Sequence, residues 1–121
     1  MAITPEFAAA FAAEWIAAWN AHDLPRVQAH YSEDFEMSSP LISAIAGEPS
    51  GCLRGKENVR TYWKTALSQN SGLDFELLEV FVDADSVVLH YRRNSGKRAA
   101  EILFFNKQGL VYRAAAHYNE N

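Results

Sequence analysis

Two neighbouring segments of alternating polarity carry three ionisable side chains that could share one face of a sheet. His90 and Arg92 lie in residues 86–93, and Glu101 lies in residues 98–105, among small and apolar neighbours. Burial among such neighbours disfavours a charged carboxylate and raises its pKa toward values useful for acid–base chemistry. A histidine titrates near neutral pH without any such shift. These residue types therefore predict proton transfer by Glu101 and His90.

A structural role for the same residues stays open. An arginine beside Glu101 would pair with it and lower its pKa, which opposes the catalytic interpretation. His90 could equally be a hydrogen-bonded histidine of a sheet. Arg92 could bind a substrate carboxylate or lie solvated at the rim of a site.

The N-terminal half predicts three helices that would cover these segments. Thr4-Pro5-Glu6 is a typical helix start, with Thr4 as the N-cap and Pro5 in the first position. Asp23 can cap a second helix reaching about residue 30, and a third begins at Gly55. Residues 35–39 predict a short strand, and no regular structure is expected for residues 40–54. The apolar stripes of the first and third helices include Phe7, Phe11 and Tyr62. Three large aromatic residues on these helices should face the sheet and serve as core or as pocket wall: Trp15, Trp19 and Trp63.

The C-terminal half predicts an antiparallel meander. Strands are expected at 73–82, 86–93, 98–105 and 110–118, separated by short turn segments that leave no room for parallel crossovers. Helices followed by a meander indicate an α+β fold, here a cone-shaped, two-layer domain spanning residues 1–121. A twisted sheet curls, and a curled antiparallel sheet capped by helices leaves a hollow for a small hydrophobic molecule.

Turn geometry predicts which side chains share a face. If Asn94 pairs with Lys97, then His90 lies opposite Glu101 and both point into the hollow. A slip of one residue in this turn would move His90 and Arg92 to the other face. Both faces of the sheet are largely apolar, so we expect a second copy of the chain to cover the outer one in a homodimer.

Composition narrows the function further. The net charge of −4 and the scattered basic residues argue against nucleic-acid and membrane-surface binding. The single cysteine, Cys52, rules out an internal disulfide, and the sequence suggests neither a signal peptide nor a membrane span, so a cytoplasmic location is expected. His22, Asp23 and His30 lack a recognised metal-ligand spacing, and no dinucleotide or phosphate-binding fingerprint occurs. No metal or cofactor is expected.

Four strings in this order, residues 15–24 (WIAAWNAHDL), 31–35 (YSEDF), 53–57 (LRGKE) and 104–111 (FFNKQGLV), resemble the nuclear transport factor 2-like superfamily. The closest similarity is to its SnoaL-like (polyketide-cyclase) and ketosteroid-isomerase-like branches. This resemblance implies the cone fold, a pocket between helices and sheet, and frequent dimers. The superfamily includes isomerases, cyclases, dehydratases and non-enzymatic binders, so it constrains function weakly.

The resemblance also suggests roles for particular residues. Glu101 matches the acid of the steroid-isomerase site, but Ser39 stands where the base aspartate is required and Trp15 where the tyrosine donor is required. Steroid isomerisation by that mechanism is therefore not expected. Cofactor-independent isomerase-, cyclase- or dehydratase-type chemistry remains, with a non-catalytic ligand-binding or accessory dimerisation module as the alternative. The residues expected to contact the ligand are Trp15, Trp19, Tyr31, Ser39, Trp63, Arg92 and Tyr118.

Overall fold

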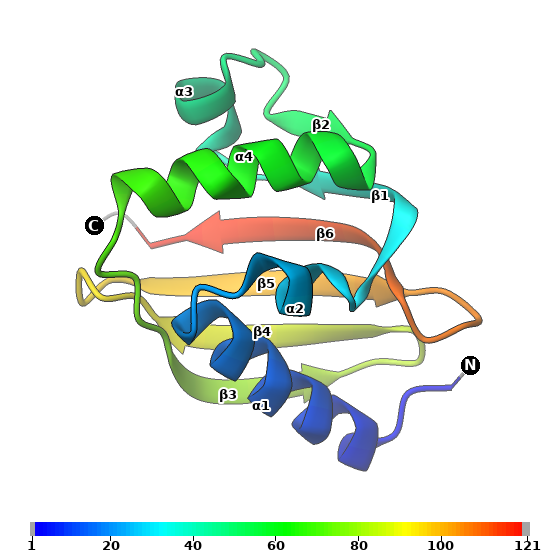
Figure 1. The fold of residues 1–121 in the computed structure, drawn as a ribbon. Coiled ribbons are helices and arrows are strands. Elements are labelled where there is room, and N and C mark those ends of the chain that lie inside the picture. The colour runs from blue at the N-terminus through cyan, green and yellow to red at the C-terminus, as the bar shows by residue number, and fades with distance from the viewer. Residues whose placement is uncertain (1, 120–121) are drawn as a thin grey trace.

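The computed structural model describes residues 2–119, in which helices pack on one six-stranded curved sheet of order β2-β1-β6-β5-β4-β3 (Figure 1). This is the predicted α+β arrangement, with one short additional helix and one short additional strand. The longer helices cover one face of the sheet. The core between the two layers is lined mainly by aromatic and aliphatic side chains. In residues 2–119 no helix combines the length and the apolar character that crossing a membrane would need.

Local signals define the first two helices as expected. Helix α1 (Pro5–Asn20) begins at the N-cap Thr4, whose hydroxyl oxygen accepts a hydrogen bond from the backbone N–H of Phe7 at 3.0 Å. Helix α2 (Leu24–Gln28) begins at Asp23, whose carboxylate caps the N–H of Arg26. The apolar stripe of α1 is buried against the sheet and includes Trp15 and Trp19.

The segment between α2 and α4 is more ordered than the sequence predicts. Strand β1 (Tyr31–Ser38) begins four residues earlier than expected and pairs in parallel with β6. Residues 40–54, for which the sequence predicts no regular structure, contain helix α3 (Ile42–Ala46) and strand β2 (Cys52–Arg54), which pairs with β1. Helix α4 (Lys56–Gln69) starts directly after Gly55, as predicted, and packs over β1.

The predicted meander is present. Its strands are β3 (Glu76–Val82), β4 (Ser86–Arg92), β5 (Arg98–Phe105) and β6 (Val111–Tyr118). Neighbouring strands of the meander are antiparallel throughout. Because side chains alternate between the two faces of a strand, the register of these pairs decides which residues face the helices.

The β4–β5 turn is one residue longer than predicted. Arg92, not Asn94, is the last paired residue of β4 and lies opposite Arg98. The Arg93 N–H donates to the Lys97 carbonyl at 2.8 Å, and Gly96 takes the left-handed conformation with φ 88°. The extra residue in the turn moves each β4 side chain to the face of the sheet opposite the predicted one. Leu89 and Tyr91 therefore point toward the helices, and His90 and Arg92 point away.

Candidate functional site

A cavity of about 270 Å³ lies between the helices and the sheet. Residues of α1, α3, α4 and five strands or the loops beside them line it. Most of its wall is apolar and aromatic, including Trp15 and Trp19 of α1, Trp63 of α4 and Phe75 before β3. Exposed Gln69 and Asn70, at the end of α4, mark its opening.

Glu101, in the middle of β5, is the acidic group of this cavity. Its side chain is 4% exposed, and the Tyr91 hydroxyl donates a hydrogen bond to its Oε1 atom at 3.2 Å. Burial raises the pKa of Glu101 from 4.5 to about 7, although the hydrogen bond from Tyr91 acts in the opposite direction. A carboxyl group with this pKa exists in both protonation states near neutral pH, so it can donate or accept a proton.

Phenol groups surround this carboxyl. Burial is the main cause that raises the pKa values of Tyr31, Tyr62, Tyr91 and Tyr118, and the charge of Glu101 raises each of them further. The phenols therefore stay protonated and act as hydrogen-bond donors. Tyr62, Tyr91 and Tyr118 line the cavity.

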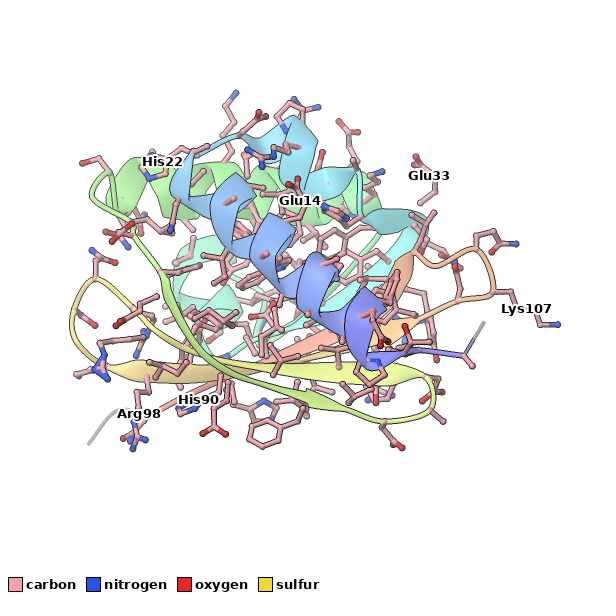
Figure 2. The ribbon with its side chains drawn as sticks, turned by 90° about the horizontal axis from the view of Figure 1, so that it is seen from below. Glu14, His22, Glu33, His90, Arg98 and Lys107 are labelled. Atoms are coloured by element: carbon pink, nitrogen blue, oxygen red, sulfur yellow. The ribbon has the colours of Figure 1, made fainter. Side chains whose placement is uncertain are left out.

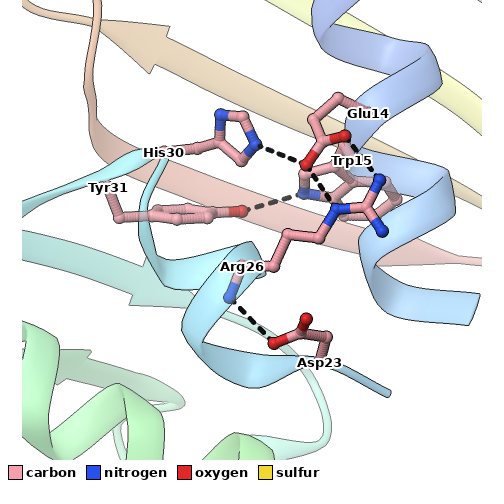
Figure 3. Close-up of polar contacts among 6 residues, drawn as sticks. All are labelled: Glu14, Trp15, Asp23, Arg26, His30 and Tyr31. Atoms are coloured by element: carbon pink, nitrogen blue, oxygen red, sulfur yellow. Dashed lines mark hydrogen bonds and ion pairs between the residues drawn. The ribbon is translucent and has the colours of Figure 1, made fainter. Parts of the chain in front are cut away.

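Trp15 does not offer its N–H to a ligand in this arrangement. Its Nε1–H donates to the Tyr31 hydroxyl at 2.9 Å, and both side chains are buried (Figure 3). The Trp15 ring still lines the cavity, where it stacks on Phe75. Tyr31 lies behind the wall, packed against Trp63, and supports the site through Trp15.

Of the other residues predicted to contact a ligand, Trp19, Trp63 and Tyr118 line the cavity. No residue in the described part of the chain accepts a hydrogen bond from Trp19 Nε1, which is buried beside the Trp63 ring. Ser39 is buried just behind the wall, where its hydroxyl accepts a hydrogen bond from the Leu41 N–H at 3.2 Å and lowers the pKa values of Tyr62 and Tyr118.

The predicted partnership of His90 with Glu101 is wrong. His90 pairs with Ala100 on the outer face, and Leu89 is the residue opposite Glu101. Figure 2 shows His90 and Arg98 on the side of the sheet away from α1. The cause is the extra residue of the β4–β5 turn, which moves every β4 side chain to the other face.

The predicted placement of Arg92 at the site is wrong for the same reason. Its side chain is 44% exposed, and its Nε atom lies 3.5 Å from Glu76 Oε1 on the outer face. The next residue, Arg93, lines the cavity instead, with its guanidinium carbon 4.4 Å from the centre of the Tyr118 ring.

Sequence reasoning missed Tyr62, Tyr91 and Arg93 as site residues. Tyr62 belongs to the apolar stripe of α4, and helical spacing alone does not indicate that its side chain reaches the cavity. Tyr91 and Arg93 follow from the true register, because residues two apart on a strand share a face with Leu89.

Several ionisable residues outside the cavity have structural partners. Glu14 forms a bidentate ion pair with Arg26, and its Oε2 atom lies 3.6 Å from Nε2 of His30 (Figure 3). His22 Nε2 lies 2.8 Å from the Leu73 carbonyl oxygen. Burial raises the pKa of the Cys52 thiol, which hydrogen-bonds to Glu36 at 3.3 Å, so this cysteine is not an activated nucleophile.

Comparisons with known proteins agree with this architecture. A SnoaL-like protein of unknown function from Burkholderia thailandensis is 50% identical; the match covers 98% of this chain and 99% of that one, with a TM-score of 0.93. An NTF2-like protein of unknown function from Cytophaga hutchinsonii is 18% identical, with coverage of 98% and 93% and a TM-score of 0.68. A protein from Agrobacterium tumefaciens, proposed to be an isomerase of the SnoaL-like family, is 16% identical, with coverage of 93% and 97% and a TM-score of 0.74. A search of curated proteins gave no match.

The family model of the SnoaL-like domain matches residues 12–119, from the first helix to the end of the last strand. That range contains the aromatic wall, the phenols and Glu101. The chain belongs to the SnoaL-like family.

Proposed function

We propose that this protein binds a small, mainly apolar molecule in the cavity and that Glu101 moves a proton within it. One observation carries the proposal: a carboxyl group with a pKa of about 7 is buried in the wall of an otherwise aromatic and aliphatic cavity. Natural proteins seldom bury a carboxyl group without a functional reason.

The arrangement favours isomerisation over chemistry that needs two titrating groups. The Glu101 carboxylate removes a proton from the carbon between a carbonyl group and a carbon–carbon double bond, and the C–H electron pair is delocalised into a dienolate. The resulting carboxylic acid then returns the proton to the far carbon of that dienolate, so the double bond moves into conjugation with the carbonyl group. Glu101 ends the cycle as the carboxylate with which it began, so the reaction consumes no cofactor, water or oxidant. Phenols near Glu101 can stabilise the enolate oxygen by hydrogen bonding.

The cavity limits the size of the ligand. An apolar cavity of about 150 Å³ holds benzene, so about 270 Å³ suits one or two rings. A four-ring steroid exceeds this volume. The isomerase assignment proposed for the Agrobacterium relative is compatible with this chemistry. A non-catalytic binding protein would use the same cavity and differ by having no turnover.

Binding of a two-ring ketone tests the ligand class. We expect 1-tetralone to raise the melting temperature of the protein, because a ligand that binds the native state stabilises it. A four-ring steroid ketone at equal concentration should produce no increase. The measurement is a thermal-shift titration with both compounds. Equal stabilisation by both, or by neither, would contradict the proposed size class.

We also propose that a second copy of the chain covers the outer sheet face. Its central row is apolar and contains Val88, Ile102 and Ala115, with the half-exposed Phe81 at one end. Residues of both charges flank this row, with Glu36, Arg54 and Arg113 on one side and Glu76, Arg92 and Arg98 on the other. A two-fold related copy can place opposite charges together around the apolar row.

Substituting Ile102→Arg is therefore expected to convert a dimer into a monomer, because it places a charge in the apolar row. Ile102→Val keeps the row apolar and should remain dimeric. Sedimentation velocity of the wild type and both variants measures the difference, with 1-tetralone binding as a check that the variants are folded. A monomeric wild type at micromolar concentration would exclude this dimer.

A further inference from the structure

The cavity contains a fixed positive charge as well as an acid. In the part of the chain that the structure describes, Arg93 and Glu101 are the ionisable lining residues other than tyrosines. A guanidinium group stays charged throughout the physiological pH range. The net charge of −4 disfavours anionic ligands over most of the protein surface. Arg93 supplies a local positive charge at one end of the cavity.

The fold holds Arg93 in position at the cavity opening. Its backbone is fixed by the turn hydrogen bond to Lys97, and its guanidinium lies over the Tyr118 ring. Two hydrogen bonds between the side chains of Asn70 and Asn94, of 3.3 and 3.0 Å, tie the end of α4 to the same turn. A cation positioned by stacking and by the backbone loses little freedom on binding a ligand.

The sheet register gives the approximate spacing between the strand positions near the two charged groups. Glu101 lies opposite Ala116, and the Tyr118 beneath Arg93 lies two residues further along β6. Two residues of a strand span roughly 7 Å. A two-ring body bridges such a distance, so one molecule can meet Glu101 at one end and Arg93 at the other.

We propose that the ligand is a monocarboxylate, with Arg93 binding its carboxylate at the cavity opening while the apolar body extends to Glu101. This inference rests on the proposed function and adds its substrate class. The planar guanidinium can donate two parallel hydrogen bonds to a carboxylate. The sequence points to the adjacent Arg92 for this role, but that residue faces the outer surface and pairs with Glu76.

The test compares 2-naphthoate with 2-naphthamide, which have nearly the same shape and differ in charge. Isothermal titration at pH 6, where Glu101 is mostly protonated, should show about tenfold tighter binding of the naphthoate to the wild type, as expected for a charge-assisted hydrogen bond. Arg93→Gln should remove this preference, so that the variant binds the naphthoate and the naphthamide with similar affinity. Arg92→Gln is the matched control and should keep the preference.

Two results would overturn the inference while leaving the proposed cavity function intact. One is equal binding of both probes to the wild type. The other is a naphthoate preference that survives Arg93→Gln or disappears equally in Arg92→Gln. If neither probe binds the wild type, the proposed function itself fails, and the carboxylate inference fails with it.

Discussion

Replacing Glu101 by glutamine is expected to slow proton exchange on a bound ketone by a factor of about 100 to 10,000, the usual contribution of general acid–base catalysis. Glutamine keeps the size of the side chain and can still accept a hydrogen bond from Tyr91, so the cavity wall should be preserved. It cannot take up a proton from carbon. Affinity for the ketone should therefore change little while exchange is lost.

The measurement is deuterium incorporation at the carbon next to the carbonyl of 1-tetralone in heavy water, followed by NMR. Glu79→Gln provides the control, because Glu79 lies opposite His90 on the outer face and should leave the exchange rate at the wild-type value. If the wild type binds 1-tetralone but exchanges it no faster than Glu101→Gln does, the protein is a binder and Glu101 is not its catalyst.

The same substitution should change how stability depends on pH. The pKa of Glu101 is 4.5 in the unfolded chain and about 7 in the folded protein. Below pH 4.5 both states hold the proton. As the pH rises toward 7, the unfolded state releases its proton first, so the folded state loses stability. The loss is complete above pH 7 and amounts to about 3 kcal/mol.

We therefore expect the free energy of unfolding of the wild type to fall by about 3 kcal/mol more than that of Glu101→Gln between pH 4 and pH 8. Urea denaturation followed by circular dichroism at several pH values measures both curves. Taking their difference removes contributions that the two proteins share, including that of Glu14, whose pKa its hydrogen bond with Arg26 lowers to about 2. Parallel curves would show that Glu101 is not buried as a carboxylic acid.

The helices were predictable because their signals are local. Thr4 and Asp23 cap the helices that follow them, and each cap needs only the next few residues of the chain. The parallel pairing of β1 with β6 depends on residues some 80 positions apart in sequence, and no local pattern specifies it. The sequence does not predict helix α3 or strand β2, because each is too short to show a clear periodicity of apolar residues.

The sequence predicts the correct face of the sheet for Glu101 and the wrong face for His90, and the registers of the two hairpins explain the difference. If Phe105 paired with Leu110 across the β5–β6 turn, as the turn residues suggest, Glu101 would lie opposite Ala114. It lies opposite Ala116 instead, a shift of two residues that leaves it on the same face. Between β4 and β5 the difference is one residue, which exchanges the faces. Since both faces of β4 carry apolar residues, the pattern could not favour Tyr91 over His90 for the inner face.

The central claim is that the Glu101 carboxyl is shielded from water inside the cavity, and a site-specific titration tests it most directly. Protein labelled with ¹³C at the glutamate carboxyl carbon is followed by NMR from pH 3 to pH 9, and the Glu101→Gln variant identifies the signal. A midpoint near pH 7 is the result the structure predicts. A midpoint near 4.5, the value of a carboxyl group in water, would contradict it.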